Sequence, residues 1–171
     1  EGRVAIVTGG SKGIGLSIAH HLAAMGAKVA IASRKIEACE AAAQEIRDAG
    51  GEAMAVACNI SRRDECEALV AKTHEAWGEA GGGAFIIVSS IGGLRGSATL
   101  GAYGISKTAD VGVTRSLAVE WGPKNITVNC IMPGLIKTDF ARALWENDSL
   151  RDDRIARTPV RRLGAPEDIG G

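Results

Sequence analysis

Residues 3–15 read R-V-A-I-V-T-G-G-S-K-G-I-G, and this stretch decides the fold. Its first six residues are rich in β-branched side chains, which is typical of a buried parallel strand. Four glycines follow, and an apolar pattern at helical spacing runs from Ile14 through Leu22 to Met25. A second strand-like run, K-V-A-I-A-S, occupies residues 28–33. The sequence therefore predicts a β–α–β unit whose tight turn opens a helix.

The glycine turn has the features of a dinucleotide cradle. Without Cβ atoms the backbone can approach a pyrophosphate closely, and the helix N-terminus offers free N–H groups and a partial positive charge. Glycines also occur in ordinary turns, but their place between a strand and a helix favours the cofactor interpretation. The predicted cofactor-binding residues here are Gly9, Ser11, Lys12, Gly13, Ile14 and Gly15.

The end of the second strand indicates which dinucleotide binds. In Rossmann-type units an acidic residue near this point bonds the ribose 2′-hydroxyl of NAD, whereas an arginine accommodates the 2′-phosphate of NADP. This chain reads Ser33-Arg34-Lys35, with no carboxylate before Glu37, and Lys12 is a second nearby cation. We therefore predict NADP(H) rather than NAD(H), with two solvated surface cations as the alternative.

Ser90, Tyr103 and Lys107 form a second cluster of interest. A free tyrosine has a pKa of roughly 10, so proton exchange near neutrality needs about 4 kcal/mol of preferential stabilisation of the phenolate. On a helix, Tyr103 and Lys107 share one face, so the ammonium can supply part of that stabilisation. Ser90 follows an apolar strand over residues 84–89, at the carboxyl edge where ligands bind in open α/β sheets. Singly each residue has a structural explanation, but together they predict proton-transfer chemistry.

Three motifs in this order resemble the short-chain dehydrogenase/reductase family over nearly the whole chain. They are T-G-x-x-x-G-x-G at residues 8–15, Ser90 with Tyr103-x-x-x-Lys107, and N-C-I-M-P-G at residues 129–134. The resemblance implies an α/β fold with a Rossmann-like, doubly wound parallel sheet, helices on both faces and a single domain over residues 1–171. It also implies hydride transfer between nicotinamide and a carbonyl or secondary alcohol, with Tyr103 as general acid/base, Lys107 as its partner and Ser90 orienting the substrate oxygen.

Further positions match the family's cofactor and substrate contacts. Asn59-Ile60 stand where the family usually has an aspartate followed by an aliphatic residue that contacts adenine. Tyr103 and Lys107 would also contact the cofactor, and the segment that holds the nicotinamide carboxamide matches Pro133, Gly134, Ile136 and Thr138. A substrate would meet Ser90, Tyr103 and an apolar stripe, although this stripe could equally pack on the core: Phe140, Leu144 and Trp145.

One departure from the family pattern is large. The N-N-A-G-type segment of the fourth strand and the following helix, which carries a catalytic asparagine, are not found between Trp77 and the strand leading to Ser90. A crossover of this kind needs on the order of 30 residues or more. Its loss would leave two inner strands of a buried sheet without a shared neighbour, which is costly. We therefore expect omitted residues near 77–83 and beyond 171, with a real truncation as the alternative.

Composition excludes several other classes of function. The 20 basic and 20 acidic residues cancel, so no footprint for nucleic acid appears. The four cysteines show no C-x-x-C spacing and the three histidines no metal-ligand arrangement, so we expect reduced thiols and no metal. No signal peptide or membrane span is visible, which predicts a cytoplasmic protein without a membrane partner.

Substrate identity and assembly are left open. The stretch P-G-L-I-K-T-D-F-A-R-A-L-W at residues 133–145 is similar to carbonyl (retinal-type) reductases of the family, with 3-oxoacyl-carrier-protein reductases as the alternative. A non-catalytic dinucleotide-binding protein and a fragment completed by a partner chain are the other possibilities. Family resemblance implies a homotetramer or homodimer built through the helix that bears Tyr103.

Overall fold

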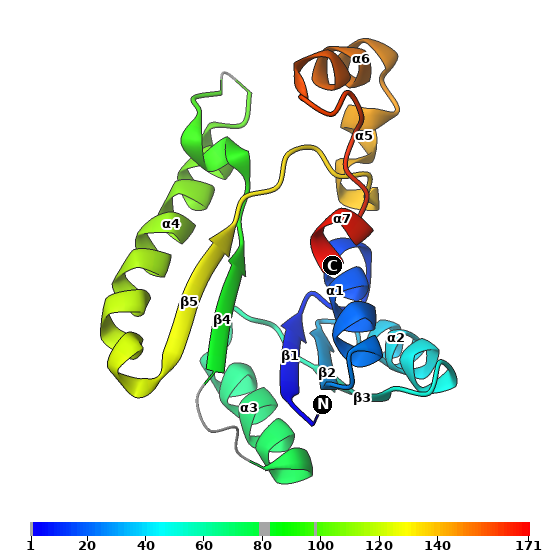
Figure 1. Cartoon of the computed structure of the whole chain (residues 1–171), viewed down its shortest axis with the longest axis vertical. Helices are drawn as coiled ribbons and strands as arrows, with labels where there is room; N and C mark the ends of the chain where they lie inside the picture. Colours follow the sequence, from blue (N-terminus) through cyan, green and yellow to red (C-terminus); the bar gives the residue numbers. More distant parts are fainter. Residues whose placement is uncertain (1, 79–82, 98) are drawn as a thin grey trace. The chain divides into compact units, whose positions relative to one another are not determined.

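Parallel strands alternate with helices along the computed structural model, which describes residues 2–78, 83–97 and 99–171 (Figure 1). The strands are β1 (Val4–Thr8), β2 (Lys28–Ser33), β3 (Glu52–Ala57), β4 (Gly83–Val88) and β5 (Ile126–Ile131). The α-helices are α1 (Gly13–Ala24), α2 (Ile36–Asp48), α3 (Arg63–Trp77), α4 (Gly101–Trp121), α5 (Arg142–Trp145), α6 (Asp148–Arg157) and α7 (Glu167–Gly170). Short 3₁₀ helices are η1 (Ile91–Leu94), η2 (Gly122–Lys124) and η3 (Asp139–Ala141).

The described strands form two parallel sheets. One has the order β1-β2-β3, with Val4 opposite Lys28 and Lys28 opposite Glu52. The other pairs β4 with β5, with Gly83 opposite Ile126. The predicted α/β class with parallel strands is therefore confirmed. Among the described residues, the strands do not join in one continuous sheet.

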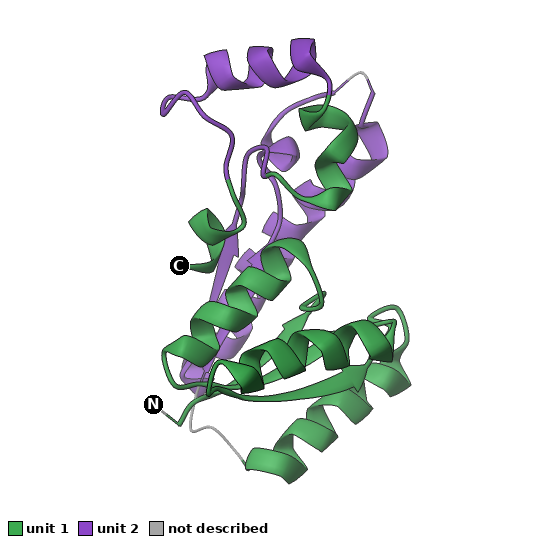
Figure 2. Ribbon diagram, turned by 90° about the vertical axis from the view of Figure 1, so that its right-hand side faces the viewer, with its two compact units in different colours: residues 1–80, 137–146, 165–171 green, residues 81–136, 147–164 purple. Residues whose placement is uncertain are grey.

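The chain divides into two compact units (Figure 2). Unit 1 comprises residues 1–80, 137–146 and 165–171, and unit 2 comprises residues 81–136 and 147–164. A single dinucleotide-binding domain over residues 1–171, with omitted segments near 77–83 and beyond 171, stays a prediction. Residues 79–82 of that window lie outside the described residues.

The core of unit 1 follows the two-residue period of its strands. Val29 and Ile31 of β2, both fully buried, pack with α1 and α2, whereas Ala32 and Val56 pack with Leu69 of α3. Successive side chains of a strand point to opposite faces, so α1 and α2 cover one face of the sheet and α3 the other. This is the doubly wound arrangement that the sequence predicts. Met25 is not part of the core, because its side chain is 76% exposed just after the end of α1.

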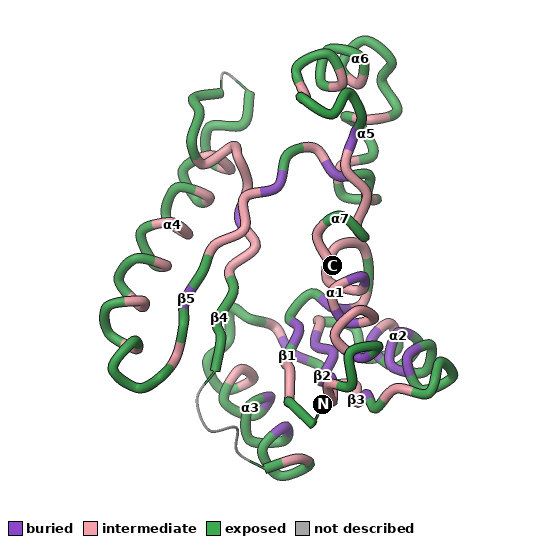
Figure 3. Tube along the Cα trace, in the orientation of Figure 1, coloured by how far each residue is buried: buried purple, intermediate pink, exposed green. Residues whose placement is uncertain are grey.

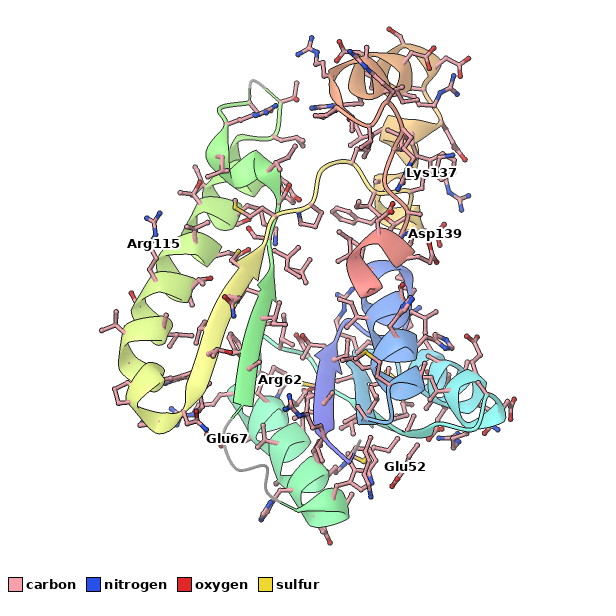
Figure 4. All side chains as sticks on the ribbon, in the orientation of Figure 1. Glu52, Arg62, Glu67, Arg115, Lys137 and Asp139 are labelled. Atoms are coloured by element: carbon pink, nitrogen blue, oxygen red, sulfur yellow. The ribbon has the colours of Figure 1, made fainter. Side chains whose placement is uncertain are left out.

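In unit 2, fewer side chains are buried between the helix and the strands than in unit 1. Helix α4 packs on β5 and η1, but none of its described residues is buried, and Figure 3 shows it mostly exposed. Arg115 projects from α4 on the side away from β4 and β5 (Figure 4). At the far end of the helix, the ring of Phe85 meets Trp121 edge to face at 5.5 Å. Buried Ile136 forms a parallel bridge with Gly164.

All four cysteines are free, as the sequence predicts. Cys58, at the end of β3, is only 2% exposed. Burial raises the pKa of the Cys58 thiol, and the neighbouring Cys66 thiol adds to this effect. The Cys58 thiol is therefore protonated near neutral pH.

Among the residues that the structure describes, none of the helices combines the length and the apolarity that crossing a bilayer requires.

Because β2 is the central strand of its sheet, its buried side chains should contribute strongly to stability. Ile31→Ala should lower the free energy of unfolding by about 3 kcal/mol, because the side chain is fully buried between two layers. The matched control is Ile60→Ala in the same unit, whose side chain is 69% exposed. Urea unfolding should show a change of less than about 0.5 kcal/mol for this control. Equal losses for the two variants would contradict the described core.

Candidate functional site

The turn between β1 and α1 favours glycine at two positions through its backbone angles and at two others through close contacts. Gly9 and Gly13 have φ angles of +69° and +57°, in the left-handed region that favours glycine. A Cβ atom on Gly15 would lie 2.3 Å from the carbonyl oxygen of Gly9, and one on Gly10 would lie 2.8 Å from that of Val7. The helix therefore starts in direct contact with the backbone of the turn.

The N-terminus of α1 is open to an anion. Lys12 precedes the helix without a side-chain capping bond, and the first turn contains no acidic residue. Among the described residues, no acceptor faces the backbone N–H groups of Gly13, Ile14 or Gly15. A Cβ atom on Gly13 would lie 3.3 Å from Thr138 Cγ2, so Thr138 borders this turn. Free N–H groups and the helix dipole suit a phosphate at this position.

Lys12 and Arg34 are among several cations of unit 1 that form no ion pair with a described residue. Both are exposed, and neither side chain bonds to any other residue in the described part of the chain. The Ser33 hydroxyl, by contrast, lies 3.0 Å from the Cys39 sulfur and donates to the Lys35 carbonyl at 3.4 Å. Arg34 and Lys12 are therefore free to meet an anionic ligand, whereas Ser33 is engaged with its own strand–helix connection.

Asn59, which follows β3, forms hydrogen bonds with residues of its own turn and of the helix after it. The Asn59 side-chain oxygen accepts bonds from the Ser61 N–H at 3.2 Å and from the Ser61 hydroxyl at 2.6 Å. Its backbone N–H donates to Glu65 at 2.7 Å. The Ile60 side chain is 69% exposed. It is therefore accessible to an adenine base. The side-chain nitrogen of Asn59, Nδ2, has no partner among the described residues.

Ser90, Tyr103 and Lys107 come together in unit 2. Ser90 follows β4 and caps η1 by accepting a bond from the Gly92 N–H at 3.1 Å. A Cβ atom on Gly92 would lie 3.3 Å from Tyr103 Cε1 and 3.4 Å from Ser90 Oγ, so the ring and the hydroxyl flank the same point. The Lys107 ammonium lies 5.9 Å from the centroid of the Tyr103 ring. All three side chains are half-buried.

Asp110 also belongs to this cluster, although it lies outside the three sequence motifs. Its carboxylate pairs with the Lys107 ammonium at 3.1 Å, and both side chains are less than one third exposed. Their separation of three residues on a predicted helix was the available signal, because residues three apart face each other. The ammonium beside Tyr103 is thus shared with a carboxylate.

The segment after β5 divides between the two units. Within unit 2, buried Pro133 accepts a bond from the Ile91 N–H at 3.0 Å, and Gly134 lies beside the Ile91 side chain. Ile136 is buried at its bridge to Gly164 and therefore has a structural role of its own. Pro133 and Gly134 are thereby held beside the Ser90 turn.

Within unit 1, the predicted apolar stripe is only partly packed. Phe140 is 88% exposed and Leu144 is 40% exposed. Trp145 is half-buried and donates from Nε1 to the Thr138 carbonyl at 2.9 Å. Trp145 therefore supports the segment that borders the glycine turn, and Phe140 is free to contact a ligand.

Comparison with protein families gives two adjoining matches. The family model described as short chain dehydrogenase matches residues 3–81, and the one described as Enoyl-(Acyl carrier protein) reductase matches residues 79–171. The second covers more than half of the chain. The two matches meet at residues 79–81, inside the window where the family segment is missing.

Curated proteins and solved structures agree with this match. Dehydrogenase/reductase SDR family member 4 of Oryctolagus cuniculus is 34% identical over 218 residues, covering 99% of this chain and 84% of that protein. The match is longer than the 171-residue chain, so the relative has residues with no counterpart here.

Among solved structures, a short-chain type dehydrogenase/reductase from Mycobacterium ulcerans has a TM-score of 0.94 at 28% identity, over 98% of this chain and 80% of that one. An actinorhodin polyketide ketoreductase with NADPH has a TM-score of 0.87 at 26% identity, over 98% and 87%. The chain belongs to the short-chain dehydrogenase/reductase family and is an oxidoreductase.

Proposed function

We propose that the protein is an NADP(H)-dependent reductase of carbonyl compounds, or the corresponding alcohol dehydrogenase, in which Tyr103 is the general acid/base. The observation that carries this proposal is the grouping of the Ser90 hydroxyl, the Tyr103 ring and the Lys107 ammonium on one turn and one helix face. Capping of η1 engages the Ser90 hydroxyl and Asp110 pairs with Lys107, but neither contact accounts for the half-buried Tyr103 ring beside them.

Each residue has a chemical task in the proposal. The Ser90 hydroxyl orients the substrate oxygen, and the Tyr103 phenol donates its proton to that oxygen during reduction. Lys107 stabilises the phenolate that results, within the limit set by its pairing with Asp110. The nicotinamide, when bound, supplies or accepts the hydride at the carbonyl carbon.

The glycine turn and two free cations support NADP(H) as the cofactor. The uncapped start of α1 suits the pyrophosphate, and unpaired Arg34 and Lys12 suit a 2′-phosphate. Two structurally similar proteins are described with NADPH and with bound NADP, respectively. NAD(H) would leave both cations without a counter-ion.

A small ketone or aldehyde is the proposed substrate, with exposed Phe140 and the neighbouring Leu144 and Trp145 lining its apolar side. A 3-oxoacyl-carrier-protein reductase is the second candidate. The family model that matches residues 79–171 is described as an Enoyl-(Acyl carrier protein) reductase, which shares the carrier protein with this candidate but not the carbonyl substrate. Turnover of small free ketones but not of a carrier-bound 3-oxoacyl group would exclude this second candidate. We also propose a cytoplasmic homotetramer or homodimer, although one relative is named as mitochondrial.

Removal of the phenol hydroxyl tests the catalytic assignment. Tyr103→Phe should lower ketone turnover by at least about 100-fold, because the proton donor is lost. NADPH binding, measured by fluorescence titration, should stay within about threefold of wild type. A variant that turns over normally would contradict the assignment. Wild-type protein that binds NADPH yet reduces no member of a broad ketone panel would support the non-catalytic alternative.

A methyl group in the glycine turn tests the cofactor cradle. Gly15→Ala should weaken NADPH binding by about tenfold or more, because its Cβ would overlap the Gly9 carbonyl. Gly112→Ala is the matched control, since Gly112 is also helical and has nothing within 4 Å of the added atom. Fluorescence titration should find this control unchanged, and equal effects would argue against a cradle.

Arg34 tests the choice between the two dinucleotides. Arg34→Ala should weaken NADPH binding by about tenfold and leave NADH binding within about twofold, because only NADPH carries the 2′-phosphate. Arg63→Ala removes an exposed cation of the same unit and serves as the control. If the Arg34 variant loses both cofactors to the same extent, the 2′-phosphate is bound elsewhere.

A further inference from the structure

Two hydroxyl groups that the mechanism does not use join helix α4 to the Ser90 turn. The Ser89 side chain, only 7% exposed, donates to the Lys107 carbonyl at 3.0 Å. Thr108 Oγ1 lies 2.7 Å from the Gly93 carbonyl oxygen and 2.9 Å from that of Gly104. A threonine hydroxyl within a helix commonly bonds only to its own preceding turn. Here its shorter contact crosses to another element.

The backbones themselves touch between these two bonds. A Cβ atom on Gly93 would lie 2.7 Å from the Lys107 carbonyl carbon and oxygen and 3.0 Å from the Thr108 nitrogen. One on Gly104 would lie 3.2 Å from the Gly92 oxygen. The peptide between Lys107 and Thr108 therefore rests directly on the turn, with one hydroxyl bond on each side of it.

We propose that Ser89 and Thr108 are positioning residues for the reaction. Ser89 is next to Ser90 in the chain, and Thr108 is next to Lys107. The two bonds run in opposite directions, because Ser89 donates to the helix and Thr108 donates to the turn. Together the two hydrogen bonds prevent helix α4 from shifting along its axis or rotating about it relative to Ser90. This inference rests on the proposed catalytic roles of Ser90, Tyr103 and Lys107.

The expected consequence of loosening this contact lies in the chemical step. Misplacement of reacting groups by about 1 Å can cost about 100-fold in rate. Neither hydroxyl belongs to the residues proposed to bind the cofactor. Loss of either bond should therefore lower kcat much more than it changes NADPH binding, for which the glycine turn and Arg34 are proposed to hold the phosphates.

The chain offers a matched pair of threonines on α4. Thr114 Oγ1 bonds only to the Asp110 carbonyl of its own helix, at 2.7 Å, among the described residues. Thr108→Val and Thr114→Val thus make the same chemical change, but only the first removes a bond to the turn. Thr108→Val should lower kcat for ketone reduction by about tenfold, with KM for NADPH within about twofold. Thr108→Ser, which keeps the hydroxyl, should restore most of the rate, and Thr114→Val should match wild type.

Ser89→Ala provides a second, independent variant on the other side of the contact. It should lower kcat to a similar extent, with Ser106→Ala as its control, because the only bond of the Ser106 hydroxyl to a described residue is to the Tyr103 carbonyl of its own helix. Thermal unfolding identifies any variant that is simply unfolded at the assay temperature.

Wild-type kcat in both Thr108→Val and Ser89→Ala would overturn the positioning role, as would equal losses in Thr108→Val and Thr114→Val. Tyr103→Phe distinguishes failure of the positioning role from failure of the proposed function. If it is inactive while Thr108→Val and Ser89→Ala are normal, only the positioning role fails. If it is fully active, the proposed function fails and the positioning role fails with it.

Discussion

Helix α4 lies on the backbone of the turn that carries Ser90, with no side chain between the two. Gly92 and Gly93 make this contact possible, because any larger residue there would meet the Tyr103 ring or the Lys107 carbonyl. The separation between the serine hydroxyl and the tyrosine ring depends on this approach. So does the part that Lys107 can play, since its side chain leaves the helix at the point of contact. Unit 2 has few buried side chains to hold the helix otherwise.

The same device occurs at the glycine turn of unit 1. There the first turn of α1 touches the carbonyl of Gly9, and the helix begins without a capping side chain. In a capped helix, side chains accept hydrogen bonds from the first N–H groups. At α1 these N–H groups have no acceptor among the described residues and can bind a ligand. In both units, glycine brings backbone against backbone at the place where chemistry is expected.

Local patterns predicted the elements well. Residues 28–33 form a strand as expected, because a short apolar run with β-branched residues is typical of a buried parallel strand. The predicted grouping of Ser90, Tyr103 and Lys107 is also found, since four-residue helical spacing fixes a common face. Tertiary context decided the rest. Met25 fits the helical pattern of α1 but lies past its end, and no local rule could place it in solvent.

Partners of the site were harder to anticipate than its members. The Ser89 and Thr108 hydroxyls act through contacts that only the folded chain displays, whereas the helical spacing of Asp110 from Lys107 is visible in the sequence. Similarly, local patterns predict single strands but not which strands pair, and the described strands form two separate sheets.

Transfer of isotope from cofactor to product tests the central claim most directly. Two samples of NADPH, carrying deuterium on one or on the other face of C4 of the nicotinamide, are incubated separately with the protein and a panel of ketones and aldehydes, and the products are analysed by mass spectrometry. The account predicts an alcohol with one deuterium on its carbinol carbon, transferred from a single face of the nicotinamide. Binding of labelled NADPH without the appearance of any deuterated alcohol would contradict it.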